Sequence, residues 1–366
     1  MIMNDLPNIG PITLNRLLQE LGGDPRGILR ATKRQLESVR GVGPETSDAL
    51  VNWRTHFDLA REEERLAQAR ATFITSGDEG YPRLLKEIHD PPIGLYRKGD
   101  YLFDRPNIAV VGSRRTTLYG QSVAKKLGSD LARLGFCVVS GLARGIDTAA
   151  HEGALAAGGK TVAVLGCGLD IIYPPENYDL YRRIAETGGV LSEFPFGRKA
   201  DKQTFPMRNR VVAGMCEAIV VVESDVSGGA MITARFAGEQ GRLIFAVPGR
   251  IDQPSSAGCH QLIRDGATLF TSVDDILNEL NYLDGLRPQA IAAPAGTPSV
   301  LESLLPQLGD DERQVLECFN GGAILGVDAL ASATGLGTPA TSAALMMLEL
   351  KKRVAKRADG TFEARN

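Results

Sequence analysis

The pattern of apolar and polar positions divides the 366-residue chain into three blocks. In residues 1–65 apolar side chains recur at helical spacing, which predicts a small helical domain. In 66–284 short β-branched runs alternate with amphipathic stretches, whereas 301–366 contains three short helical stretches and a hairpin-like end. Residues 285–300 are rich in Ala, Pro and Gly and predict a linker. Several domains are expected, because one core seldom organises a chain of this length.

The middle block predicts an α/β fold with an extended Rossmann-like, mostly parallel sheet. Continuous apolar runs separated by helices are typical of strands that helices cover on both faces. Residues 72–74 and 94–96 are expected to add edge strands. Ligands of such sheets bind outside the carboxyl ends of the strands. The expected strands are Ile108–Val111, Cys137–Val139, Thr161–Leu165, Val190–Leu191, Ala218–Val222 and Leu243–Val247.

The first block contains two similar phrases, Leu6–Pro11 and Val39–Pro44, each followed by an apolar helix. A glycine turn before a helix leaves backbone amides free to face a phosphate. The phrases resemble the paired helix-hairpin-helix elements of SAM-like domains and make Gly41 and Gly43 candidate secondary DNA contacts. The first is the weaker candidate, since Asn8 stands where glycine is expected. A packing or interaction module without DNA contacts is the alternative.

The third block looks like a small winged helix. Asp359 and Gly360 form a good two-residue hairpin turn within a basic segment. If this wing binds duplex DNA, Lys356 and Arg357 are the expected phosphate contacts. A partner-binding role is equally open.

Composition does not decide whether the chain binds nucleic acid, but it argues against a disulfide-stabilised, metal-binding or membrane protein. The formal net charge is −3, and phosphate binding needs only a local basic patch. The five cysteines are far apart and mostly lie in apolar runs, which is typical of buried thiols in a reducing compartment. The four histidines have no metal-ligand spacing, so neither a metal nor a cofactor is expected. Without a leader-like start or an apolar run of about 18 residues, a cytoplasmic protein with no membrane contact is expected.

The first candidate site follows the first central strand, at Gly112, Ser113, Arg114 and Arg115. A tight glycine turn, a hydroxyl and two guanidinium groups can hold a phosphate. The turn lacks the G-x-G-x-x-G spacing of dinucleotide-binding folds. Two arginines that are merely exposed on a loop are the alternative.

The second candidate site follows the next strand, where Gly141 permits close backbone approach and Arg144 adds positive charge. Asp147 is placed to cap the following helix. His151 lies one helical turn later, so a structural hydrogen bond between Asp147 and His151 is expected rather than a catalytic pair.

The third candidate site is the segment 202–210, in which cations surround a single aromatic residue, Phe205. Charge for the backbone and a ring on which a base can stack are what a non-specific single-strand binder needs. A core position for Phe205 is the alternative. The candidate contacts are Lys202, Phe205, Arg208, Asn209 and Arg210.

The fourth candidate site is the turn Ser227, Gly228 and Gly229, which opens a helix with Thr233 on its first turn. Free amides and the helix dipole favour an anion there. Four phosphate-binding turns at one edge of one sheet suggest a track for a polynucleotide rather than a site for a mononucleotide.

The chain resembles the DprA (Smf) family of DNA-processing proteins of bacterial transformation and recombination. Seven stretches between residues 112 and 249 follow the family order: 112–114, 140–147, 166–174, 192–195, 205–210, 227–234 and 247–249.

The resemblance implies a non-enzymatic Rossmann-like core that dimerises, binds single-stranded DNA without strong sequence preference and interacts with RecA to load it. By motif match the DNA contacts are Ser113, Arg114, Gly141, Arg144, Lys202, Phe205 and the turn Ser227–Gly229. Asn209 and Arg210 belong to the same motif with either a binding or a structural role, and the family pattern is looser at Arg115.

A nucleotide-cleaving enzyme is the main alternative. Gly229–Thr233 is similar to the turn of lysine-decarboxylase-like phosphoribohydrolases, which pair it with a nearby catalytic Glu. Glu239 lies downstream, but its spacing is not the expected one, and cleavage of an N-glycosidic bond needs such a carboxylate at the sugar. A sequence-specific regulator that acts through the winged helix would leave four phosphate turns unexplained.

Overall fold

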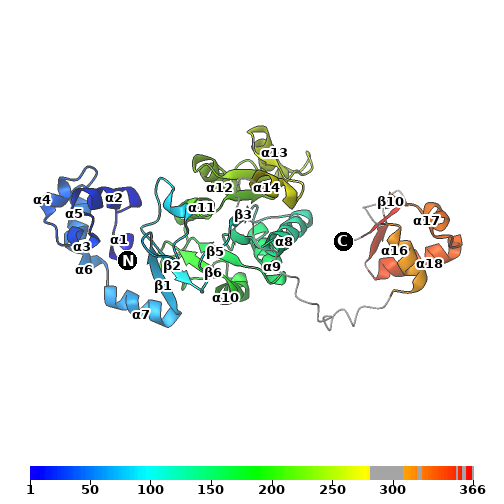
Figure 1. The fold of residues 1–366 in the computed structure, drawn as a ribbon, viewed down its shortest axis with the longest axis horizontal. Coiled ribbons are helices and arrows are strands. Elements are labelled where there is room, and N and C mark those ends of the chain that lie inside the picture. The colour runs from blue at the N-terminus through cyan, green and yellow to red at the C-terminus, as the bar shows by residue number, and fades with distance from the viewer. Residues whose placement is uncertain (281–307, 320–323, 352, 357–359, 365–366) are drawn as a thin grey trace. The chain divides into compact units, whose positions relative to one another are not determined.

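The fold is described by a computed structural model that covers residues 1–280, 308–319, 324–351, 353–356 and 360–364. The chain divides into two compact units, Met1–Ala293 and Pro294–Asn366, and each has its own hydrophobic core (Figure 1). The predicted linker at 285–300 lies outside the described residues.

The first unit is built on a nine-stranded sheet of order β1-β2-β6-β5-β4-β3-β7-β8-β9. The seven strands β6, β5, β4, β3, β7, β8 and β9 pair in parallel with their neighbours. The pairs β1–β2 and β2–β6 are antiparallel. This confirms the predicted extended Rossmann-like fold and the edge strand at 72–74. The piece at 94–96 also forms a strand, but it is not at the edge, because it pairs with β1 on one side and β6 on the other. The strands are β1 (Ala71–Thr75), β2 (Gly94–Lys98), β3 (Asn107–Val111), β4 (Cys137–Ser140), β5 (Thr161–Leu165), β6 (Gly189–Ser192), β7 (Ala218–Val221), β8 (Leu243–Ala246) and β9 (Thr268–Leu269).

Helices cover both faces of the sheet, because alternate side chains of each strand point to opposite faces. Ile108 and Val110 of β3 pack in one core cluster, and Ala109 and Val111 pack in the other. The first cluster includes residues of α8 (Leu118–Arg133), α9 (Ile146–Ala156) and α14 (Val273–Glu279), and α10 (Tyr178–Thr187) packs beside β5 and β6. The second includes residues of α11 (Thr204–Gly214), α12 (Gly229–Glu239) and α13 (Pro254–Arg264).

Helices α8 and α9 are in contact backbone to backbone. A methyl group on Gly128 would overlap the carbonyl oxygen of Ala150, and one on Gly153 would overlap that of Lys125. The two glycines therefore permit an approach that no larger residue allows.

The N-terminal helices have a core cluster that includes Leu17, Leu36 and Leu50. Gly41 has φ +92°, and Asn8 adopts a similar left-handed conformation at φ +62°, so both hairpins form despite the substitution. Helix α7 continues past the expected boundary at residue 65, and Leu66 packs in a core cluster of the sheet. The helices are α1 (Ile2–Asp5), α2 (Pro11–Glu20), α3 (Pro25–Ile28), α4 (Lys33–Glu37), α5 (Pro44–Val51), α6 (Trp53–His56) and α7 (Leu59–Ala69).

The second unit has the order of a winged helix, as predicted. Three helices, α16 (Asp310–Glu317), α17 (Val327–Thr334) and α18 (Thr338–Leu350), accompany a sheet of order β10-β12-β11. Its strands are β10 (Ile324–Leu325), β11 (Val354–Lys356) and β12 (Phe362–Ala364). Of the predicted turn, Asp359 lies outside the described residues.

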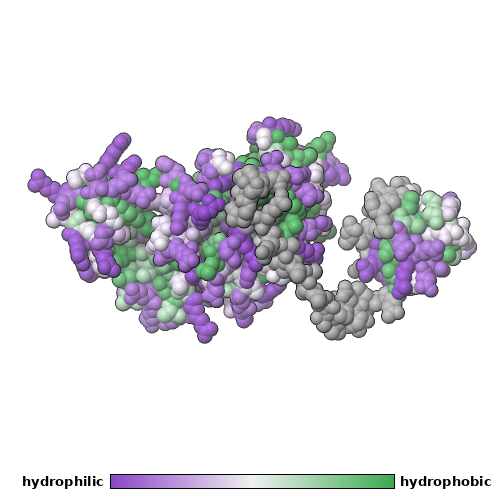
Figure 2. All heavy atoms as spheres, viewed as in Figure 1, coloured by the Kyte–Doolittle hydropathy of each residue, from purple (hydrophilic) through white to green (hydrophobic). Residues whose placement is uncertain are grey.

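Hydrophilic residues occupy much of the visible surface, with smaller hydrophobic areas among them (Figure 2). Among the described residues, no helix is both long and apolar enough to cross a membrane.

Candidate nucleic-acid interface

All four predicted turns contribute to one open cavity of about 580 Å³ at the carboxyl ends of the strands. The sheet order reverses at β3, which has β4 on one side and β7 on the other, and crevices at such points are where open α/β sheets bind ligands. The lining includes Gly112, Ser113, Arg114, Arg115, Gly141, Phe205, Asn209, Gly228, Gly229 and Thr233. We refer to this cavity as the groove.

A buried carboxylate that the sequence patterns did not reveal holds the first turn. Glu223, 3% exposed, accepts hydrogen bonds from Thr116 Oγ1 (2.6 Å), Thr117 N (2.9 Å) and Thr117 Oγ1 (2.5 Å). Its carbonyl oxygen accepts from Ser113 N at 2.7 Å. The turn is therefore fixed before any ligand binds, and Arg114 remains exposed beyond it.

The second turn is held by Asp147, which accepts hydrogen bonds from Gly141 N (3.0 Å) and Ala143 N (3.3 Å). Burial raises the pKa of this carboxyl group. The carboxylate lies in the first turn of α9 and bonds back to the preceding loop, whereas the N-cap of that helix is Gly145. The predicted capping role is therefore wrong, and the actual role is to shape the loop.

The predicted hydrogen bond between Asp147 and His151 is also wrong. His151 Nδ1 lies 2.6 Å from Thr161 Oγ1, and that hydroxyl donates to Val138 O at 2.7 Å. The imidazole must therefore donate from Nδ1. Its Nε2 has no hydrogen-bond partner among the described residues, and burial lowers the pKa of His151 to about 3.

Arg144 is half exposed and forms an ion pair with Glu176. It does not line the groove but lines a smaller adjoining pocket with Arg114, Tyr173 and Phe205. Arg144 is thus placed beside the groove with part of its charge already neutralised.

Phe205 is half-buried in the first turn of α11 and lies outside the hydrophobic core clusters that the described residues form. The guanidinium carbon of Arg114 lies 4.6 Å from the centroid of its ring, and the Tyr173 ring lies 5.9 Å away. Lys202 is exposed just before the helix. A ring beside an exposed cation is suited to a stacked base and its phosphate.

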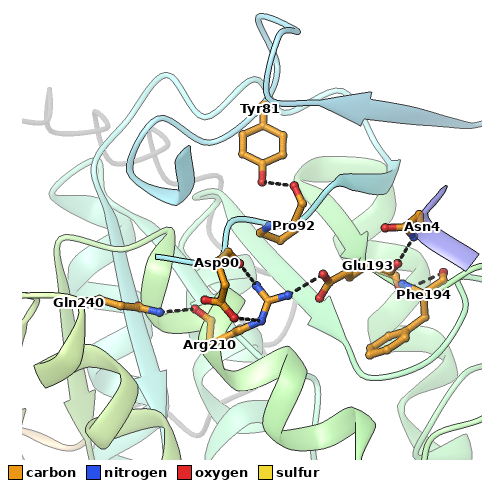
Figure 3. Close-up of polar contacts among 9 residues, drawn as sticks. Asn4, Tyr81, Asp90, Pro92, Glu193, Phe194, Arg210 and Gln240 are labelled. Carbon is orange, nitrogen blue, oxygen red and sulfur yellow. Dashed lines mark hydrogen bonds and ion pairs between the residues drawn. The ribbon is translucent and has the colours of Figure 1, made fainter. Parts of the chain in front are cut away.

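Arg208 and Arg210 differ from the exposed cations, because both guanidinium groups are buried and already hydrogen-bonded. Of the two, Arg208 lines the groove and Arg210 does not. Arg208, 5% exposed, donates to Gly141 O (2.5 Å) and Val164 O (2.7 Å). Arg210, 4% exposed, is enclosed by Asp90 and Glu193 (Figure 3). The two cations of 208–210 look like a basic patch in the sequence, but the helix turns both guanidinium groups inward.

The fourth turn begins α12. The Asp225 carboxylate accepts from Ser227 N (2.8 Å) and Ser227 Oγ (2.9 Å), so this amide is already used within the turn. Gly228 is the N-cap of the helix, and a methyl group there would overlap Ser224 Oγ. Thr233, 3% exposed, lines the floor of the groove.

Among the described residues, the candidates for secondary DNA contacts do not line the groove. Gly41 has φ +92° and Gly43 is the N-cap of α5, as the predicted hairpin requires. Lys356 is exposed on β11, with Nζ 5.8 Å from the Phe362 ring centroid, and Arg357 lies outside the described residues. Helix α18 has neither Lys nor Arg, and it exposes Met346, Met347 and Leu350, which is unlike a helix that enters a DNA groove.

The family model for DNA recombination-mediator protein A matches residues 72–281, which include every strand of the large sheet except part of β1. The chain belongs to the DprA family. A second model, the DprA winged helix domain, matches residues 300–360.

Relatives named DprA or Smf match over much of their own length. The DNA processing protein DprA of Streptococcus pneumoniae is 45% identical over 206 residues, covering 56% of this chain and 73% of the relative. Protein Smf of Synechocystis is 37% identical over 285 residues, covering 76% and 71%.

Two solved DprA structures share the fold. The X-ray structure of S. pneumoniae DprA superposes with a TM-score of 0.66 at 34% identity, covering 76% of this chain and 95% of that one. A Helicobacter pylori DprA structure, described for its single-stranded DNA binding mode, superposes with a TM-score of 0.53 at 32% identity, covering 58% and 96%.

Proposed function

We propose that this DprA-family chain binds single-stranded DNA in the groove without strong sequence preference. The observation that carries the proposal is the half-buried Phe205 ring with the exposed Arg114 guanidinium 4.6 Å from its centroid. Every base has a flat π-face and every nucleotide a phosphate, so a ring and a cation recognise DNA without reading its sequence. The H. pylori relative supports this proposal, since its structure is described in terms of single-stranded DNA binding.

We further propose that the bound strand is passed to RecA during DNA uptake or recombination in the cytoplasm. Family membership supports this step. A homodimer formed through the Rossmann-like unit is also proposed, because β9 ends the sheet and Leu269 on it is 45% exposed. An uncovered edge strand can pair with another chain.

The enzymatic alternative is disfavoured by where its carboxylate lies. Glu239 is at the last position of α12, ten residues from Gly229, and a rise of about 1.5 Å per residue puts the two backbones about 15 Å apart. Glu239 also faces Arg235, at 3.6 Å. A general acid must lie within hydrogen-bond reach of the sugar, which this position does not offer.

The main experiment compares Arg114→Ala and Lys202→Ala in titrations of a labelled oligothymidylate at several salt concentrations. Each variant should bind more weakly and lose about 0.7 from the slope of log K against log salt, as expected for one phosphate contact on a single strand. Arg133→Ala, an exposed arginine at the last turn of α8, is the matched control and should leave both quantities unchanged. Unchanged affinity and slope in both the Arg114→Ala and the Lys202→Ala variant would contradict the proposal.

The enzymatic alternative has its own test. The purified protein should release no free base from nucleoside monophosphates. Turnover that Glu239→Gln abolishes would instead assign the chain to the phosphoribohydrolases.

A further inference from the structure

Arg210 of helix α11 forms a buried ion cluster with Asp90 and Glu193, none of which lines the groove (Figure 3). Arg210 donates from Nη1 to Asp90 O (2.9 Å) and from Nη2 to Glu193 Oε1 (2.5 Å), and its Nε lies 3.3 Å from Asp90 Oδ2. Arg210 is 4% exposed and Glu193 is 9% exposed. A buried charge is tolerated only with such partners, so the geometry of the cluster is tightly constrained.

The same cluster joins elements that are far apart in the sequence. Asn4 of α1 donates from Nδ2 to Glu193 O at 2.5 Å. Gln240, the C-cap of α12, donates from Nε2 to Arg210 O at 3.3 Å. Figure 3 shows Asn4 and Gln240 on opposite sides of Arg210. The N-terminal helices and the end of α12 are therefore linked to one position on α11.

Helix α11 is held at neighbouring positions by two guanidinium groups. Arg208 binds carbonyl oxygens at the ends of β4 and β5, and Arg210 binds Asp90 and Glu193. Phe205 lies five residues before Arg210 on the same helix, about 7.5 Å along its axis. A shift or rotation of α11 would therefore move the Phe205 ring relative to Arg114.

We propose that Arg210 is a positioning residue for single-strand binding: its cluster with Asp90 and Glu193 fixes α11 so that the Phe205 ring stands at the groove. Through Asn4, the N-terminal helices influence DNA affinity without touching the strand. The inference rests on the proposed function of the groove. Charged partners suit this role because their directional contacts fix one arrangement, whereas apolar packing tolerates several.

The test is a double-mutant cycle between Glu193→Gln and Phe205→Ala. The glutamine side chain has the same size as the glutamate and keeps an oxygen acceptor for Arg210, but it lacks the charge. Glu193→Gln should weaken oligothymidylate binding by less than Phe205→Ala does, and its salt slope should stay unchanged because no phosphate contact is lost. In the Phe205→Ala background it should have no further effect.

The outcomes separate this inference from the proposed function. If Arg114→Ala and Phe205→Ala weaken binding and Glu193→Gln does not, or if the two effects add, the positioning role is overturned. If Arg114→Ala and Phe205→Ala leave binding unchanged, the proposed groove itself fails.

A milder variant covers the case in which Glu193→Gln does not fold. Asn4→Ala removes only the side-chain link from α1 to Glu193 O and should lower single-strand affinity in the same non-additive way. Asn15→Ala, an exposed asparagine on α2, is the matched control and should change nothing. Equal affinity for the Asn4→Ala and Asn15→Ala proteins would overturn the link to the N-terminal helices.

A spectroscopic readout distinguishes positioning from general loss of stability. The chain has one tryptophan, Trp53, so a Trp53→Phe, Phe205→Trp protein reports on the groove alone. Adding Glu193→Gln should change the emission maximum and acrylamide quenching of the reporter in the folded, DNA-free protein. An unchanged spectrum would contradict the proposal.

Discussion

At the scale of single residues, the groove depends on side chains with different tasks. Arg114 is exposed and free to meet a phosphate, whereas Glu223 and Asp147 are buried and shape the loops around it. The sequence could place the exposed residues, because a glycine turn after a strand has a recognisable pattern. It could not separate Arg208 and Arg210 from surface cations, since only the direction of α11 shows that they point inward.

Phe205→Ala should weaken single-strand binding by about 1–3 kcal/mol, the usual contribution of one base stacked on an aromatic ring. The salt slope should stay that of the unaltered protein, because no cation is removed. Fluorescence anisotropy with a labelled oligothymidylate measures both, and Phe205→Tyr, which keeps a ring, serves as the control. If Phe205→Ala lowered the salt slope and left the affinity unchanged, Phe205 would act on the phosphates.

His151 should make stability depend on pH. Burial lowers its pKa in the folded state to about 3, whereas the unfolded chain takes up the proton near 6.5. The associated stability is present above pH 6.5 and is lost as the pH falls toward 3. Urea unfolding gives the free energy of unfolding of each protein. The value for the natural protein minus that for His151→Gln should fall by about 1.4 kcal/mol per pH unit below 6.5. If this difference in unfolding free energy were the same at pH 7 and at pH 5, His151 would not titrate in this way.

At the scale of elements, the turns proposed to bind phosphate depend on how closely two loops approach. Gly145 has φ +80°, and a methyl group on it would overlap the carbonyl oxygen of Ser113. The second turn therefore supports the first. The sequence predicted both turns separately, but it contains no local signal for this contact, because the two loops are brought together only when β3 pairs with β4.

Gly145→Ala should destabilise the chain by more than Gly158→Ala. Gly158 has φ +70°, and no atom of the described residues lies within 4 Å of the place that a Cβ would occupy. Alanine there meets backbone strain alone, about 1–2 kcal/mol. Urea unfolding compares the two. Single-strand affinity should fall for Gly145→Ala only, and equal affinities would mean that the first turn does not need this support.

Helix α11 shows where sequence periodicity stops being informative. It has buried residues on several sides, among them Thr204, Arg208, Arg210 and Val211, so it lacks the one-sided apolar stripe of a surface helix. Its existence could be expected from the alternation of strands and helices, but its orientation could not.

At the scale of the whole molecule, separate cores predict separate folding. The winged-helix unit has a core cluster of its own, including Val315, Leu345 and Phe362. A chain that ends at residue 293 should bind single strands with unchanged affinity and salt slope, since all groove residues lie before that point. Gel shifts with single- and double-stranded DNA on the full and shortened chains provide the measurement. Loss of single-strand binding on shortening would assign the wing a direct part in it.

The close contact of α8 and α9 at Gly128 and Gly153 has a genetic consequence. These helices follow the first two turns of the groove, so a side chain inserted between them would push those turns apart without altering any groove residue. Gly153→Ala is therefore a design for a conditional allele. Cells carrying it should lose the protein's function at high temperature and keep it at low temperature, although every side chain proposed to contact DNA is intact.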